Sequence, residues 1–492
     1  MTRTKSLKVI VTTLTLLSAV TLTGCVATGV NQTSTNSNYL TGGYESVSAS
    51  YLDKNGELDI KGDDLESLLV GGKALHDSGY WRQSAEAFER AEKLLAWKSD
   101  SVDTPAEVAK LLGTALTNDT LASYNGKIFE GVMLDYYQAL NYLMQGDESK
   151  ARVRFNRLND RQKNAETQLR KYTETLSKSE KNTEGEKKPS ENEQKIIAQT
   201  ENEAGDALSK GTLAIPVGVK SNEIRNPAGD LLGAVFRSTS ISRSDKQGGV
   251  IDGLVNHAST KGVSADARKF AGKLGTELKS AKQNHIFVIY EDGRGPSVDE
   301  FRVDLPVFLI SKDVLYSGIA LPEFKAGQVV HAKIKAQSGK ITDDLVKVSD
   351  LNRMASLEFG SSYEGKVAKA VTSAVIKTVA QAAINKEIDE KNQGNPLAGL
   401  LMKTAVAAGQ AALTQADTRS WFNLPDSIHL GVLKRDSSSA LRLSNQAGEE
   451  LALVTLPNVE GDVLVYARQA APGGELKVYV QNLPANAQAA SL

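Results

Sequence analysis

The sequence predicts a multidomain α+β protein: an N-terminal helical module, then a mixed domain that combines β-strands with an Ala-rich helical hairpin. Three observations support this fold class. Apolar residues recur with a helical period over residues 65–95 and 130–162. Four segments between residues 440 and 481 alternate apolar and polar residues, as β-strands do. Two Ala-rich stretches of helical length, 364–387 and 397–416, lie between these regions.

Residues 1–24 have the pattern of a signal peptide. A basic start precedes an apolar core of about fourteen residues, which is too short for a stable transmembrane helix. The only cysteine, Cys25, directly follows Gly24 in the segment Leu-Thr-Gly-Cys, which resembles the bacterial lipobox. The resemblance implies cleavage between Gly24 and Cys25, a diacylglyceryl group on the thiol, and an acyl chain (palmitate) on the new amino group. An ordinary signal peptide followed by a chance cysteine is the alternative.

The residues after the cysteine bear on location. Residue 26 is Val rather than Asp, which resembles the sorting pattern of outer-membrane lipoproteins. We therefore expect an outer-membrane, lipid-anchored protein that faces the periplasm or the cell exterior, held by lipid chains that each contribute about 0.8 kcal/mol per buried CH₂. Residues 25–59 hold the lipidated cysteine and are rich in Ser, Thr, Asn and Gly, so they are expected to form a flexible tether.

Charge and composition exclude several kinds of partner and site. The net charge of −1, from 58 basic and 59 acidic residues, argues against a nucleic-acid partner. A single cysteine excludes an internal disulfide and any site that needs several thiolates. The five histidines are dispersed, and no two have the spacing of metal ligands. We expect no metal and no cofactor.

Residues 60–172 are expected to form a helical domain whose two units resemble tetratricopeptide repeats (TPRs). Small residues let paired helices approach closely, and a glycine turn joins them in each unit. The packing positions are Gly72, Gly79, Trp81, Ser84, Phe88 and Ala91 in the first unit, and Ala139, Tyr142, Gly146, Ala151 and Phe155 in the second. Such repeats bind proteins through a concave face. A purely structural helical bundle is the alternative.

The rest of the chain is divided by composition and pattern. Residues 173–195 contain almost no apolar side chains and are expected to be a polar, disordered linker. The mixed domain covers 196–427, with two strands expected over 286–310. Its Ala-rich helices, 364–387 and 397–416, are expected to form a buried antiparallel hairpin, with membrane insertion or oligomerisation as alternatives. Residues 428–492 are expected to be a β-meander and tail.

Several motifs occur in a fixed order: YEDGRGP at 290–296, SGIALPEF at 317–324 and ADTRSWFNLPDSI at 416–428. Together with the lipobox, the TPR-like units and the Ala-rich pair, they resemble a family of uncharacterised bacterial TPR-like lipoproteins. Genes of that family often neighbour one for a penicillin-binding-protein-activator-like lipoprotein related to curli-export components. The resemblance implies a role in cell-envelope assembly, with envelope proteins such as neighbouring lipoproteins as partners, but brings no established activity.

Two of these motifs contain candidate site residues: Glu291, Asp292 and Arg294 in the first, and Asp417, Arg419 and Trp421 in the last. The acids could serve as general acid–base groups, and Arg419 could bind a carboxylate or a glycan. We instead expect a turn loop with exposed charges at 291–296, and a segment at 417–421 that pins the end of the Ala-rich helix against the β region.

Three functions are compatible with these patterns. The leading hypothesis is a non-enzymatic adaptor whose helical module recruits envelope proteins. The first alternative is an enzyme or glycan-binding protein that acts on peptidoglycan through Glu291, Asp292 or Arg419. The second is a subunit of a secretion or surface-structure system in which the Ala-rich hairpin makes the oligomer contact.

Overall fold

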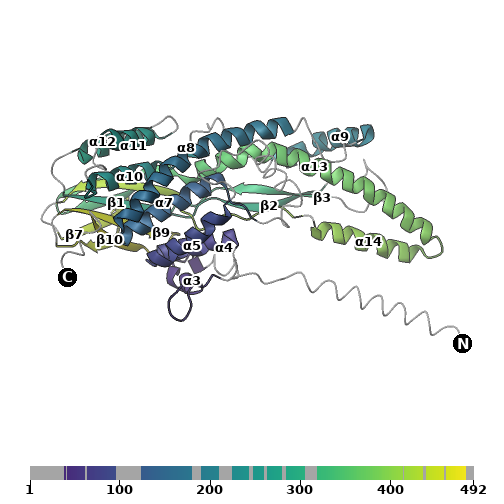
Figure 1. The fold of residues 1–492 in the computed structure, drawn as a ribbon. Helices are drawn as coiled ribbons and strands as arrows, with labels where there is room; N and C mark the ends of the chain where they lie inside the picture. The colour runs from purple at the N-terminus through teal and green to yellow at the C-terminus, as the bar shows by residue number, and fades with distance from the viewer. Residues whose placement is uncertain are drawn as a thin grey trace.

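The structure is a computed structural model that describes residues 38–39, 41–60, 64–95, 124–179, 190–209, 224–242, 248–259, 263–279, 284–304, 318–413, 415–435, 439–458 and 461–483. It has an α+β fold in which helices pack around a sheet and a long helical hairpin extends from one end (Figure 1). The predicted cleavage and lipidation residues, Gly24 and Cys25, lie outside the described residues.

An eight-stranded sheet lies at the centre of the fold, with the spatial order β10-β9-β1-β6-β5-β4-β7-β8. Neighbouring strands are antiparallel except β1 and β9, which are parallel. Every residue of β1 and β9 is buried, which matches their almost continuous apolar runs. The strands are β1 (His285–Asp292), β4 (Ile334–Ser338), β5 (Ile341–Asp350), β6 (Ser427–Lys434), β7 (Ala440–Asn445), β8 (Glu450–Thr455), β9 (Asp462–Gln469) and β10 (Lys477–Leu483).

The predicted C-terminal β-meander is wrong in its connectivity, although its strands are present. The β7–β8 hairpin lies at one edge of the sheet and the β9–β10 hairpin at the other, and β1, β6, β5 and β4 lie between them. Alternation of polarity shows which face of a strand is buried but not which strand lies beside it. Strands from before the Ala-rich helices (β1, β4 and β5) and after them (β6 to β10) therefore share one sheet.

Two helical hairpins occupy the region predicted to be TPR-like. The first is α4 (Leu65–Asp77) with α5 (Trp81–Leu94), and the second is α7 (Ile128–Met144) with α8 (Glu148–Ser179). Every residue of α7 is buried, so this helix is a core element. Membership of the repeat class stays a prediction.

The remaining helices of the body extend this helical layer. They are α9 (Glu191–Leu208), α10 (Pro227–Thr239), α11 (Gly248–Ala258) and α12 (Ala265–Leu278). Because α8 runs to Ser179 and α9 begins at Glu191, both ends of the predicted disordered linker, 173–195, are helical instead. Lys, Glu and Leu favour a helix even where the segment is too polar to predict a core.

The predicted tether is also wrong for the described part of residues 38–60. This segment includes the short helix α3 (Tyr44–Ala49), and the side chains of Tyr39, Tyr44 and Val47 are buried. They join the largest hydrophobic cluster of the described residues, whose members run from Tyr39 to Leu483 and cross the predicted domain boundaries. Three large apolar side chains in a polar stretch are enough to hold it against the body.

The Ala-rich helices form an antiparallel hairpin of α13 (Leu351–Lys391) and α14 (Pro396–Leu413). The first half of α13 packs against α7, α8, α9 and the small sheet made of β2 (Ser297–Asp304) and β3 (Gly318–Lys325). The second half of α13 and α14 extend away from the body (Figure 1). The expectation of a buried hairpin is wrong for this distal half, where Ile384, Leu397 and Leu401 are exposed.

Gly72 tests the close packing of α4 on α5. A Cβ atom at this position would lie 2.6 Å from Cε1 of the buried Phe88 ring. We expect Gly72→Val to lower the free energy of unfolding by about 1–3 kcal/mol, because the packed ring has no room to move. Urea unfolding measures the change. The control is Gly272→Val on α12, where a Cβ would meet nothing within 4 Å; it should change stability by less than about 0.5 kcal/mol. Equal effects of the two substitutions would contradict the packing argument.

Candidate functional site

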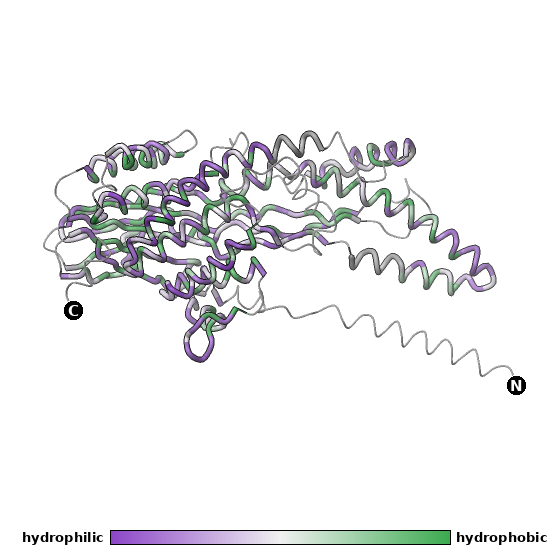
Figure 2. Tube along the Cα trace, in the orientation of Figure 1, coloured by the Kyte–Doolittle hydropathy of each residue, from purple (hydrophilic) through white to green (hydrophobic). Residues whose placement is uncertain are grey.

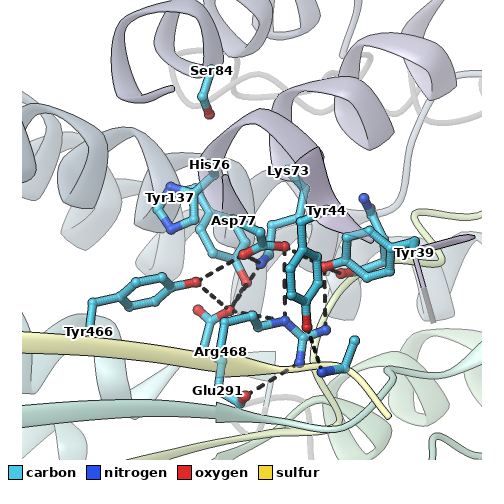
Figure 3. Close-up of polar contacts among 12 residues, drawn as sticks. Tyr39, Tyr44, Lys73, His76, Asp77, Ser84, Tyr137, Glu291, Tyr466 and Arg468 are labelled. Carbon is cyan, nitrogen blue, oxygen red and sulfur yellow. Dashed lines mark hydrogen bonds and ion pairs between the residues drawn. The ribbon is translucent and has the colours of Figure 1, made fainter. Parts of the chain in front are cut away.

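Four charged side chains meet in the interior where α4 lies against the sheet. Lys73 and Asp77 come from α4, Glu291 from the end of β1 and Arg468 from β9, and all four are completely buried (Figure 3). We call these four residues the buried charge cluster. Lys73 and Asp77 share one face of α4 because they are four residues apart. Glu291 and Arg468 are register partners in the parallel β1–β9 pair, so the sheet places them side by side.

The cluster joins its elements through direct ion pairs. Lys73 Nζ lies 3.1 Å from Glu291 Oε2 and also pairs with Asp77 on its own helix. Arg468 Nε lies 3.9 Å from both Asp77 Oδ2 and Glu291 Oε2. Each cation therefore contacts both anions. The guanidinium of Arg468 also donates Nη1–H to the carbonyl oxygens of Gly293, at 2.6 Å, and Gln469, at 3.0 Å.

Buried tyrosines complete the shell of the cluster. The Tyr39 hydroxyl donates to Asp77, and the Tyr137 hydroxyl donates to Glu291 Oε2 at 3.1 Å. The Tyr466 hydroxyl lies 3.1 Å from Asp77 Oδ1 and 3.0 Å from Glu291 Oε2, so it bridges the two carboxylates. The Tyr44 hydroxyl accepts the backbone N–H of Ala470 at 2.9 Å. The N-terminal segment, the helices and the sheet thus contribute hydroxyl groups to one polar centre (Figure 3).

The surroundings of Asp77 favour its charged form. Burial opposes the charge of Asp77, but Lys73 and Arg468 outweigh it and hold the pKa of this carboxyl below its usual range. His76 lies beside the cluster, and burial together with Lys73 lowers its pKa to about 3, so its imidazole is neutral. His76 Nδ1 lies 2.7 Å from Asn141 Oδ1. The two basic residues of the cluster, Lys73 and Arg468, are matched by its two acidic residues, Asp77 and Glu291.

The burial of the cluster supports a structural role for it. Its four charged side chains have no exposed surface, and none of them lines the described cavity of about 200 Å³ between α8, α10 and α11. Among the described residues, no group of three or more His, Cys, Asp or Glu side chains is placed to hold a metal ion. A buried ion pair resists the loss of either partner because the remaining charge would be uncompensated. The cluster therefore fixes α4 on the sheet.

The first predicted motif lies in the interior, and the expectation of exposed charges there is wrong. Glu291 belongs to the buried charge cluster, and Asp292 is also completely buried. Asp292 accepts the backbone N–H groups of Val330, at 2.9 Å, and His331, at 3.1 Å, and burial raises its pKa to about 6. Arg294 exchanges two backbone hydrogen bonds with Gln328. Both acidic residues that were expected in the loop, Glu291 and Asp292, belong to a strand instead, because β1 continues through Asp292.

The second predicted motif is held close to the first by the helices. Asp417 Oδ1 accepts Nε–H of Arg419 at 2.8 Å, and this pair is partly buried. Trp421 donates its backbone N–H to Glu130 on α7 at 2.9 Å. Its ring lies 5.8 Å from the ring of Tyr137, which itself bonds Glu291. The segment is thus pinned against α7, and the expected contact with the β region is made just before it, where the backbone N–H of Ala416 donates to Glu300 of β2 at 2.7 Å.

The predicted TPR-like packing positions are mostly buried contacts between helices. Ser84 Oγ donates to the carbonyl of Gly72 at 2.7 Å, and Tyr142 donates to Glu89 at 2.6 Å. The Trp81 ring lies 4.9 Å from the ring of His76. The turn residues Gly79 and Gly146 have φ of 79° and 77°, which favours glycine. Phe88, Ala91, Ala139, Ala151 and Phe155 are buried.

The sequence analysis missed Lys73, Asp77 and Arg468. A weak signal was present for each of them. Lys73 and Asp77 are charged residues four apart in the otherwise apolar stretch LLVGGKALHD, and Arg468 ends the apolar run VLVYA. A charge inside such a stretch needs a partner. The partners could not be named, because Glu291 is more than two hundred residues from α4 in the sequence.

A second acidic junction holds the start of α7. Glu358 of α13 accepts the backbone N–H groups of Ile128, at 2.9 Å, and Phe129, at 3.2 Å. These groups have no partner within the helix, so the carboxylate caps α7 from outside. Burial outweighs these hydrogen bonds and raises the pKa of Glu358 to about 7.

Removing Lys73 tests the buried charge cluster. Lys73→Met keeps the length of the side chain but leaves Asp77 and Glu291 with Arg468 alone. We expect the free energy of unfolding to fall by about 3–5 kcal/mol. Lys73→Met combined with Glu291→Gln should recover part of that loss, because the charges balance again. Arg82→Met breaks an exposed pair with Glu57 and should leave the unfolding midpoint nearly unchanged. If Lys73→Met lowered the free energy of unfolding no more than Arg82→Met does, the role of the buried charge cluster would be contradicted.

Glu358 gives a prediction for the effect of pH. Its pKa is raised in the folded state, so the folded protein binds more protons than the unfolded chain between about pH 4.5 and 7. The stability this group contributes is present below pH 4.5 and is lost as the pH rises to about 7. Relative to Glu358→Gln, the wild type should lose about 1.4 kcal/mol of unfolding free energy per pH unit in this range. Urea unfolding at several pH values measures it. The control is Glu364→Gln, at an exposed position on the same helix; its unfolding free energy should change with pH as that of the wild type does. The prediction is refuted if the unfolding free energy of Glu358→Gln also changes with pH as that of the wild type does.

Comparisons with known proteins do not extend this picture. A scan against protein-family models found no match, and neither the curated proteins nor the solved structures gave a significant match to the chain. The family resemblance and the function therefore depend on the residues and contacts described above.

Proposed function

We propose that the protein is an outer-membrane lipoprotein that acts as a non-enzymatic interaction adaptor in the assembly of the cell envelope or of surface structures. The observation that carries this proposal is the position of the only cysteine. Cys25 ends a signal-peptide pattern within a lipobox-like segment. A lipid at this position would confine every contact of the chain to the envelope.

The contacts of the candidate residues favour an adaptor over a peptidoglycan enzyme. Glu291 is buried and paired with Lys73, Asp292 caps two backbone N–H groups, and Asp417 is paired with Arg419. A general acid or base must reach its substrate within hydrogen-bond distance. Side chains that are buried and already paired within the fold are poorly placed for that task.

The burial of α7 restricts where the helical module could bind a partner. Because all of α7 lies in the core, a groove lined by this helix is not available. The outer face of α5 carries charged residues at helical spacing that are exposed to solvent: Arg82, Glu86, Glu89 and Lys93. We place the recruiting surface on this face.

The experiment is photo-crosslinking in intact bacteria from a residue introduced at Glu86. A discrete adduct with an envelope protein is expected, and mass spectrometry identifies the partner. The matched control position is Lys269, an exposed residue on α12, from which this adduct should be absent. Deletion of the module would not serve, because its helices share the largest hydrophobic cluster with the sheet.

Cys25→Ala in the same cells tests the anchor. The variant should lack the lipid by mass spectrometry, leave the outer-membrane fraction and lose the Glu86 adduct. The anchor would be disproved if the wild-type protein carried an unmodified thiol. The adaptor would be disproved if Glu86 and Lys269 gave the same adducts.

A further inference from the structure

The distal hairpin, residues 378–413 of α13 and α14, exposes large apolar side chains on its outside. Leu397, Leu400 and Leu401 are 67 %, 52 % and 63 % exposed. Because they are three and four positions apart, they form one face of α14. Met402, whose sulfur lies 3.8 Å from Asn392 Nδ2 at the end of α13, and Ile384 on α13 are also about half exposed. The only charged side chain of α14, Lys403, lies on the other side, where it pairs with Asp389 of α13.

The inside of the same hairpin is polar. Thr378, Gln381, Asn385 and Asp389 follow one another at spacings of three or four along α13, so they share one face of that helix. The Asp389–Lys403 pair shows that this face is turned towards α14. Thr378, Gln381 and Asn385 are buried, and the Gln381 amide makes no hydrogen bond within the described part of the chain. The α13 side of the contact between the two helices is thus largely polar, whereas the leucines of α14 face outwards.

This inverted polarity is characteristic of helices surrounded by lipid. In water, paired helices bury apolar residues and expose polar ones. In a bilayer, lipid gives no advantage to an apolar interior, and polar side chains between helices hold them together instead. We propose that the leucine face of α14 lies in the interfacial region of a lipid bilayer, so that the distal hairpin rests on the membrane surface.

The charges decide between lying on the membrane and spanning it. Within the described residues, the helix segment Lys366–Lys391 is long and apolar enough to span a membrane. However, Lys377 in its middle is exposed, and the turn of the hairpin is hydrophilic (Figure 2), with five charged residues at 386–391. A span would place Lys377 in hydrocarbon and move all five charges across it. If only α14 contacts the membrane, Lys377 and the five charged residues of the turn stay in water.

A protein partner fits the observations less well. A second copy of the chain or another protein would also cover Leu397, Leu400 and Leu401. Protein interfaces carry a charged and polar rim, whereas the only charge of α14, Lys403, is turned towards Asp389 of α13 and leaves the leucine face without a charge of its own. The two contacts differ in what surrounds the leucines, which a probe at one of them can report.

The test uses the chain from Val26, which keeps every described residue and has no cysteine of its own. Leu401→Cys is labelled with an environment-sensitive fluorophore and mixed with phosphatidylethanolamine–phosphatidylglycerol vesicles that carry nitroxide lipids. We expect a blue shift and quenching by the nitroxide. The matched control is Leu453→Cys on β8, where the native leucine is 60 % exposed, against 63 % for Leu401; it should show neither change.

A second variant measures the contribution of the leucine face. Leu400→Ser combined with Leu401→Ser should weaken vesicle binding by about tenfold or more in cosedimentation, since the loss of two buried leucines exceeds the free energy of one decade. Circular dichroism verifies its folding, and the two positions are exposed, so no core contact is lost. The proposal is overturned if the label at residue 401 is not quenched by nitroxide lipid, or if it becomes shielded from iodide without vesicles as protein concentration rises, which would indicate self-association. This chain lacks the proposed lipid anchor, so failure here would leave the anchor intact.

Discussion

The buried charge cluster imposes a condition on the whole fold. Lys73, Asp77, Glu291 and Arg468 can stay out of water only if all four are together, because each cation is neutralised by both anions. They come from α4, β1 and β9, and Tyr39 adds a hydroxyl from the N-terminal segment. An intermediate in which α4 has not reached the sheet would keep the pair within α4 (Lys73 with Asp77) and the pair within the sheet (Glu291 with Arg468), but would lose the ion pairs between them. The cluster therefore favours complete assembly over partial docking, and it specifies where α4 lies.

This condition accounts for other features of the body. The parallel pairing of β1 with β9 brings Glu291 beside Arg468, and it separates the β9–β10 hairpin from the other C-terminal strands. The helix α7 lies between the cluster and α13, where Tyr137 reaches Glu291 and Glu358 caps its first turn. Acidic residues that could have suggested catalysis are thus used to join elements.

The distal hairpin obeys a different rule from the body. In the body, apolar side chains are buried and charges are paired inside; in the hairpin, leucines face outwards and amides face inwards. One chain with two such arrangements is suited to two surroundings. A body in the aqueous phase, a lipid at residue 25 and an arm that rests on the bilayer would together fix the orientation of the protein on a membrane. An adaptor with a fixed orientation presents the same face of α5 to every partner.

The sequence by itself determined the positions of most helices and strands, because periodicity and turn residues are local signals. It predicted the β1 and β2 strands, the paired helices of residues 65–95 and 130–162, and the hairpin of α13 and α14. It also drew attention to Glu291, Asp292 and Trp421, but it assigned the two acids to an exposed loop and Trp421 to a segment that pins the end of the Ala-rich helix. Only the tertiary structure decided that β9 lies beside β1, that Tyr39 and Tyr44 bind the body, and that Lys73 meets Glu291 and Arg468. The physical reason is distance along the chain: a local pattern shows that a residue is buried, whereas the partner that makes its burial tolerable comes from a segment hundreds of residues away.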